Sequence, residues 1–204
     1  MRTIFVTISI LLLLGSKNPQ ESRILFDGVS LDGWQVIEYP GHGDIAIIDS
    51  CVIVEAGKEV SGIRWTGDFP TNNYEVTLDA KRVEGSDFFL GMTFPVNDSF
   101  MTLVLGGWGG SVTGLSSIDG YDAADNSTGS SYNFKQDQWY KIRLRVSDEL
   151  IEAWVDKDYV VGFRYDGYFL SLRWEMDSSV PFGITTYRTK GSFRNIRLNT
   201  DIKK

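Results

Sequence analysis

A run of acidic residues in the segment SSIDGYDAAD is the first candidate for chemistry in this chain. It places Asp119, Asp122 and Asp125 at intervals of three residues. Their carboxylates could supply oxygen ligands to calcium, but the run lacks the alternate-residue spacing and the distal glutamate of an EF-hand loop. A solvated acidic loop is therefore the favoured interpretation, and a calcium site formed by these residues is the alternative.

Aromatic side chains form a second set, suited to stacking against the apolar faces of sugar rings. Trp108 is the most distinctive member, because the four glycines around it in GGWGG offer neither local cover nor a regular strand backbone. The other candidates for such a platform are Trp65, Tyr121, Trp154 and Trp174. Each of them could equally be a core aromatic, and only a grouping on one sheet face would favour the platform.

Arginines provide fixed positive charges at Arg64, Arg173 and Arg188. Each guanidinium could bind sugar hydroxyls or an enolate oxygen, or could pair with a glutamate on a polar sheet face. His42 is the only histidine and lies between glycines in PGHGD, which favours a solvated loop residue and excludes a histidine-rich metal site. Cys51, the only cysteine, lies in an apolar run that favours a buried, unreactive thiol.

The elements that must position these residues are short β-strands. Hydrophobic and polar residues alternate with period two in YEVTLDAK (74–81) and in YKIRLRV (140–146), as in half-buried strands. FFLGMTF and FMTLVL are nearly continuous apolar runs, typical of central strands covered on both faces. Because turn residues separate about ten or more such strands, we expect an all-β antiparallel sandwich or jelly roll. The stretch 106–132 reads as a long irregular loop, a candidate for function.

Length and charge limit the classes of protein that the chain could be. Its 204 residues fit one domain, which we expect to span residues 21–204. Residues 1–20 hold Arg2 and an apolar run too short for the roughly 20 residues of a membrane span, which predicts a signal peptide or an uncleaved N-terminal anchor. We therefore expect a secreted or periplasmic protein, membrane-anchored if the signal is uncleaved. A net charge of −7 makes nucleic acid an improbable partner.

Several segments in order resemble the 3-keto-disaccharide hydrolase family, also described as a 3-keto-glucoside lyase and hydratase domain. LFDGVSLDGW (25–34) is similar to the opening motif of that family. The segments 62–82 and 137–161 are similar to its early strand pair and its late hairpin, and FGITTYRTKGSFRNIRLN (182–199) to its closing strand. The resemblance covers residues 24–199 and implies a concanavalin-like or laminin-G-like sandwich that acts on a carbohydrate.

The family resemblance also implies a chemistry. A 3-keto group acidifies the proton on the neighbouring C2, so elimination requires a base near C2, stabilisation of the enolate oxygen, and an acid for the leaving group. The candidates for these catalytic roles are Asp87, Asp122, Glu175 and Arg188.

Substrate binding and the noncatalytic alternative depend on a different set of residues. The substrate-binding candidates are Arg64, Trp65, Trp108, Tyr121 and Trp174. The alternative is a noncatalytic carbohydrate-binding or adhesion module on the same fold. Acidic groups gathered beside an aromatic shelf would favour the enzyme, and a shelf without them the binding module.

Overall fold

The computed structural model describes residues 22–202, so the predicted signal or anchor segment at residues 1–20 lies outside the described residues. The described part contains two β-sheets and one short 3-10 helix, η1 (Trp174–Ser179). No helix in this part of the chain is long and apolar enough to cross a membrane.

Sheet A and sheet B are both antiparallel throughout. The strands of sheet A are β1 (Ser22–Ile24), β3 (Ile45–Ile48), β4 (Cys51–Val54), β6 (Tyr74–Glu84), β11 (Trp139–Val146), β12 (Leu150–Val155), β13 (Asp158–Arg164) and β15 (Lys190–Asn199). The strands of sheet B are β2 (Trp34–Val36), β5 (Val60–Trp65), β7 (Leu90–Val96), β8 (Ser99–Gly107), β9 (Val112–Ser116), β10 (Ser130–Ser131) and β14 (Phe182–Tyr187).

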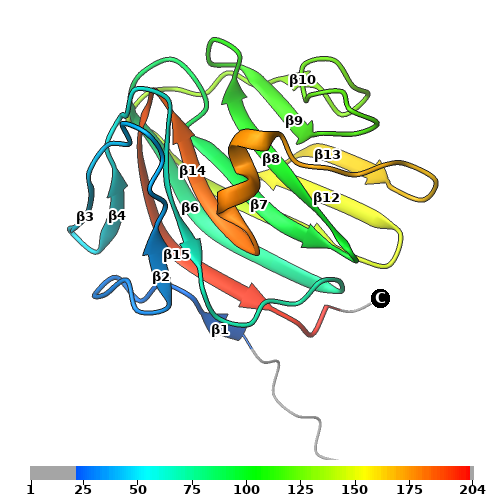
Figure 1. Cartoon of the computed structure of the whole chain (residues 1–204), viewed down its shortest axis with the longest axis horizontal. Coiled ribbons are helices and arrows are strands. Elements are labelled where there is room, and N and C mark those ends of the chain that lie inside the picture. Colours follow the sequence, from blue (N-terminus) through cyan, green and yellow to red (C-terminus); the bar gives the residue numbers. More distant parts are fainter. Residues whose placement is uncertain (1–21, 203–204) are drawn as a thin grey trace, which may run out of the picture.

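The strand order is β13-β12-β11-β6-β15-β4-β3 in sheet A, with β1 also paired to β15, and β10-β9-β8-β7-β14-β5-β2 in sheet B. Figure 1 shows the two sheets stacked face to face, with η1 in front of β7 and β14 on the outer side of sheet B. The predicted antiparallel β-sandwich is therefore confirmed.

The core lies between the sheets, where the alternating sequence pattern places it. In β6, Tyr74, Val76, Leu78 and Ala80 are buried, while the residues between them are half-buried on the outer face. β7 is buried along its whole length, as its continuous apolar run predicts. Cys51 is also buried. The inward faces of both sheets thus form one hydrophobic cluster.

The stretch 106–132 differs from the prediction, because it is not one irregular loop. It contains the end of β8, all of β9 and the short β10, and GGWGG spans the last two residues of β8 and the start of the turn to β9. The φ angles of Gly106, Trp108, Gly109 and Gly110 are 76°, 48°, 88° and 113°, a left-handed turn that glycine adopts at little cost. The small residues of β9, such as Gly114 and Ser116, carry too little hydrophobic pattern to reveal a strand from sequence alone.

Candidate functional site

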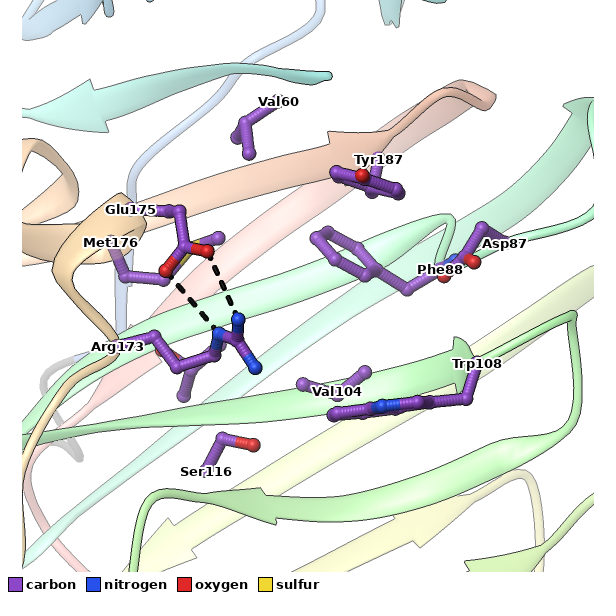
Figure 2. A pocket seen from close by; sticks show the side chains of 11 residues that line it. Val60, Asp87, Phe88, Val104, Trp108, Ser116, Arg173, Glu175, Met176 and Tyr187 are labelled. Carbon is purple, nitrogen blue, oxygen red and sulfur yellow. Dashed lines mark hydrogen bonds and ion pairs between the residues drawn. The ribbon is translucent and has the colours of Figure 1, made fainter. Parts of the chain in front are cut away.

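A cleft of about 280 Å³ lies on the outer face of sheet B, the face opposite the core. Its volume is at the lower end of the range for small-molecule sites, enough for a small ligand such as one or two sugar rings. The cleft is lined by Val60, Asp87, Phe88, Thr102, Val104, Trp108, Ser116, Arg173, Glu175, Met176 and Tyr187. In Figure 2 the aromatic rings occupy one side of the cleft and the Arg173–Glu175 pair the other.

Trp108 forms one aromatic wall of this cleft. It lies at the tip of the β8–β9 turn, and 43% of its surface is exposed. A Cβ atom placed on the neighbouring Gly109 would meet nothing within 4 Å, so the turn is open beside the indole at that position. The prediction that the glycines present this side chain rather than bury it is therefore consistent with the structure.

Arg82 holds the Trp108 turn from below. Its side chain is buried, and its Nη2 donates to the backbone oxygens of Gly110 at 2.9 Å, Asp87 at 3.1 Å and Gly106 at 3.2 Å. The guanidinium also lies 5.3 Å from the ring centroid of Phe89. Burial lowers the pKa of Arg82, opposed by the nearby carboxylate of Asp87. One guanidinium thus connects the Trp108 turn to the segment that carries Asp87.

Phe88 and Tyr187 form the second aromatic wall. Their rings stack with a centroid separation of 5.7 Å and an interplanar angle of 29°. The backbone supports this pair, because Tyr187 N donates to Phe88 O at 3.0 Å. Arg188 stacks over the outer side of Tyr187, with its guanidinium 5.0 Å from the ring. The cleft therefore has two ring surfaces against which a sugar could pack.

Arg173 and Glu175 form the polar end of the cleft, at the start of η1 (Figure 2). Arg173 donates from Nη2 to Glu175 Oε1 at 3.0 Å and from Nε to Oε2 at 3.3 Å, and its Nη1 also pairs with Asp122. Burial alone would raise the pKa of Glu175, but the hydrogen bonds and charge of Arg173 outweigh it, so the pKa is lowered. The pKa of Arg173 is raised, chiefly by its hydrogen bonds to Glu175. Both groups are therefore charged at neutral pH.

Asp87 is the carboxylate on the aromatic side of the cleft. Its Oδ1 accepts from Phe88 N at 2.7 Å, and its Oδ2 accepts a longer bond of 3.3 Å from Gly109 N. No ion pair to Asp87 occurs among residues 22–202. This carboxylate is therefore the one in the cleft with the most freedom to accept a proton from a ligand.

The structure brings together four of the candidate residues from the sequence, Asp87, Trp108, Arg173 and Glu175, in the lining of one cleft. Asp122 lies behind that lining, where it accepts from Arg173 and from Ser117 Oγ at 3.1 Å.

The remaining candidates do not line the cleft. Arg64 donates to Gln35 at 2.8 Å, and Trp65 packs edge-on against Trp34, with ring centroids 5.5 Å apart. Arg188 lies at the rim, where its Nε donates to Lys58 O at 3.0 Å.

Three further aromatic candidates also lie outside the cleft lining. Tyr121, in the segment between β9 and β10, is 60% exposed, and Trp174, the first residue of η1, is 76% exposed. Trp154 projects from the outer face of sheet A, where the guanidinium of Arg143 stacks 3.7 Å from its ring.

Two of the three aspartates of the proposed calcium loop, Asp119 and Asp122, have separate side-chain partners. Asp119 Oδ1 accepts from Phe169 N at 2.9 Å, and Asp122 pairs with Arg173. Within residues 22–202, no three His, Cys, Asp or Glu side chains are grouped so that they could hold a metal ion. The calcium site formed by Asp119, Asp122 and Asp125 stays a prediction, whose test is the melting temperature in calcium and in chelator.

Phe88, Tyr187 and Arg82 were not predicted as site residues. Phe88 has the same parity as the core residues Leu90 and Met92, but the chain is irregular before β7, and Phe88 turns into the cleft while Phe89 is buried. Arg82 could have been identified from the sequence, because it has the same alternation in β6 as the residues that point into the core. A charged side chain at such a buried position requires hydrogen-bond partners within the protein.

Solved structures similar to this one share its fold across most of their length. A protein of unknown function with a galectin-like fold from Bacillus subtilis has a TM-score of 0.65 at 11% identity and covers 90% of this chain and 96% of its own. The carbohydrate recognition domain of Emp46p has a TM-score of 0.59 at 11% identity and covers 85% of this chain and 90% of its own. The carbohydrate-binding module CBM66 from Bacillus subtilis has a TM-score of 0.54 at 11% identity and covers 82% of this chain and 95% of its own.

A comparison with curated protein sequences gives no match. A family model does match, over residues 21–199, which is most of the chain and includes every residue that lines the cleft. The resemblance drawn from the sequence motifs is thereby confirmed. The chain belongs to the family described as the 3-keto-alpha-glucoside-1,2-lyase-like domain.

Proposed function

We propose that residues 21–204 form one secreted or periplasmic domain that binds a saccharide in the cleft on sheet B. The observation that carries this proposal is the exposed indole of Trp108, which faces a cleft with a second aromatic wall and a charged polar end. Sugar rings have apolar faces, which would pack on the aromatic walls of the cleft. Their hydroxyl groups would bind the charged side chains at its polar end. The family to which the chain belongs supports a carbohydrate as the ligand.

Replacing Trp108 with alanine tests the binding proposal. We expect saccharide affinity to fall by about 1 to 3 kcal/mol, since one aromatic contact is lost. The melting temperature should stay close to that of the wild type, because the indole is 43% exposed and contributes little to the core. Binding can be measured on a glycan array and then by calorimetry with the saccharides that bind.

A matched control is Trp154→Ala, which removes an indole from the outer face of sheet A. It should leave saccharide affinity unchanged. Equal losses in both variants, or unchanged binding in Trp108→Ala, would refute a platform at Trp108. A loss of stability of roughly 3 to 5 kcal/mol in Trp108→Ala would instead assign Trp108 to the core.

A second candidate function is the cleavage of 3-keto-glycosides by elimination and hydration. Asp87 favours it, because this carboxylate lines the cleft and has no ion-pair partner in the described residues. In this reaction Asp87 would take the C2 proton to give the enolate. The enolate electrons would then form the C1–C2 double bond as the bond from C1 to the leaving oxygen breaks, and Asp87 would return the proton to that oxygen. Arg173 is the only basic side chain among the residues that line the described cleft, but its ion pairs with Glu175 and Asp122 limit how far it could stabilise an enolate oxygen. Glu175 is unsuited to donate a proton, because Arg173 keeps its pKa low.

The noncatalytic alternative makes a different prediction for the same substrates. A binding module would bind methyl α-glucoside and its 3-keto derivative without consuming either. Incubation with both compounds, followed by chromatography for released methanol and the 2-hydroxy-3-keto-glycal product, separates the two functions. Turnover of the 3-keto compound alone would identify the enzyme, and binding without turnover the module.

A further inference from the structure

The positive charge of Arg173 in the cleft is already neutralised by carboxylates of the protein itself. Arg173 is the only basic side chain among the residues that line the described cleft. Its Nε and Nη2 donate to the two carboxylate oxygens of Glu175, and its Nη1 donates to Asp122. All three guanidinium nitrogens therefore have an anionic partner. An arginine occupied in this way has little capacity left for a carboxylate or sulfate on a ligand.

Negative charge exceeds positive charge around the cleft. Asp87 and Glu175 both line it, and Asp122 adds a third carboxylate directly behind Arg173. Asp122 is itself fixed, because its second oxygen accepts from Ser117 Oγ at 3.1 Å. A ligand that enters the cleft thus meets more carboxylates than free cations.

The other arginines near the cleft do not reverse this balance. Arg82 lies buried beneath the Trp108 turn, where its guanidinium donates to three backbone oxygens, and its charge offsets part of that of the nearby Asp87 without exceeding the three carboxylates. Arg188 lies at the rim, donates to Lys58 O at 3.0 Å and has Glu59 Oε1 at 3.8 Å from its Nη2. Neither residue lines the cleft.

We propose that the cleft selects saccharides without acidic groups, and that Asp122 determines this selectivity by occupying Arg173. This inference rests on the proposed saccharide binding and adds the class of ligand. Neutral sugars and amino sugars fit, because hydroxyls and ammonium groups can donate to Glu175 and Asp87. Uronates and sulfated sugars are rejected, because like charges would face each other in a partly desolvated cleft.

The test uses a glycan array that carries neutral glycans together with their amino, uronate and sulfated counterparts. Asp122→Asn removes the charge that occupies Arg173 Nη1 while keeping the shape of the side chain. We expect the ratio of acidic to neutral glycan binding to rise at least about tenfold, as expected when a partly desolvated charge a few ångströms away is removed. Asp79→Asn is the matched control, because Asp79 pairs with Arg194 at 3.1 Å on the outer face of sheet A. It should leave the ratio unchanged.

The outcomes are distinguishable. The inference is supported if the wild type binds neutral or amino glycans and the ratio of acidic to neutral glycan binding rises in Asp122→Asn alone. Wild-type binding to uronates as strong as to their neutral parents, or the same ratio in Asp122→Asn and Asp79→Asn, overturns the inference while leaving saccharide binding intact. Binding to no glycan overturns the proposed function itself. If Asp122→Asn does not fold, Glu175→Gln removes the other carboxylate partner of Arg173 and should raise the same ratio, together with a loss of amino-glycan binding because Glu175 itself lines the cleft.

Discussion

Replacing Asp87 with asparagine is expected to lower the turnover of a 3-keto-glycoside by about 10² to 10⁴-fold, the contribution of a positioned general base. Asparagine keeps the shape, and its single oxygen can still accept from Phe88 N, the shorter of the two bonds, while the 3.3 Å bond from Gly109 N is lost. The turn should persist, because Arg82 still donates to the oxygens of Gly106 and Gly110. The measurement is kcat/KM with 3-keto methyl α-glucoside, together with the affinity for unoxidised methyl α-glucoside. The affinity should change much less than the turnover.

Asp137→Asn is the matched control for this variant, because Asp137 is exposed and pairs only loosely with Lys81, at 3.6 Å. Its turnover should equal that of the wild type. Full activity in Asp87→Asn would show that another group removes the proton. A wild-type protein that turns over no 3-keto compound would favour the binding module.

Replacing Arg82 with methionine is expected to lower the free energy of unfolding by about 2 to 4 kcal/mol, because a buried charged donor is lost. Methionine retains much of the apolar bulk near Phe89, but the backbone oxygens of Asp87, Gly106 and Gly110 lose their shared donor. Urea denaturation measures the change. Saccharide affinity should fall as well, since the same turn positions Trp108.

Arg145→Met provides the control for the loss of an arginine from sheet A. Arg145 pairs with Glu75 at 3.0 Å on the outer face, and its side chain is 33% exposed, so we expect a loss of about 1 kcal/mol or less. If Arg82→Met were no less stable than Arg145→Met, the assigned role of Arg82 beneath the turn would be wrong.

The fold could be predicted from the sequence because its strands are half-buried. In β6 the inward residues Tyr74 to Ala80 alternate with polar residues, and only one register keeps the first set in the core. Leu25 and Trp34 close the LFDGVSLDGW segment, with Trp34 Nε1 donating to Leu25 O at 2.7 Å. β9 was not predicted, because its small residues Gly114 and Ser116 interrupt the alternation of hydrophobic and polar residues that indicates a strand.

The site could be predicted only in part, because it is assembled from segments far apart in the sequence. Trp108 was recognisable from its glycines alone, which are a local signal. Glu175 lies opposite Trp108 because of the way η1 crosses sheet B, and no local sequence pattern predicts that crossing. The pairing of Arg173 with both Asp122 and Glu175 joins two loops, and sequence spacing alone left its partners undecided.

The most direct test of the account is a crystal structure of the domain with a bound saccharide chosen from the glycan array. We predict a sugar ring packed against the indole of Trp108, with hydroxyl groups within hydrogen-bonding distance of Arg173 or Glu175. A saccharide bound elsewhere, for example on Trp154 at the outer face of sheet A, with the cleft on sheet B free of sugar, would contradict it.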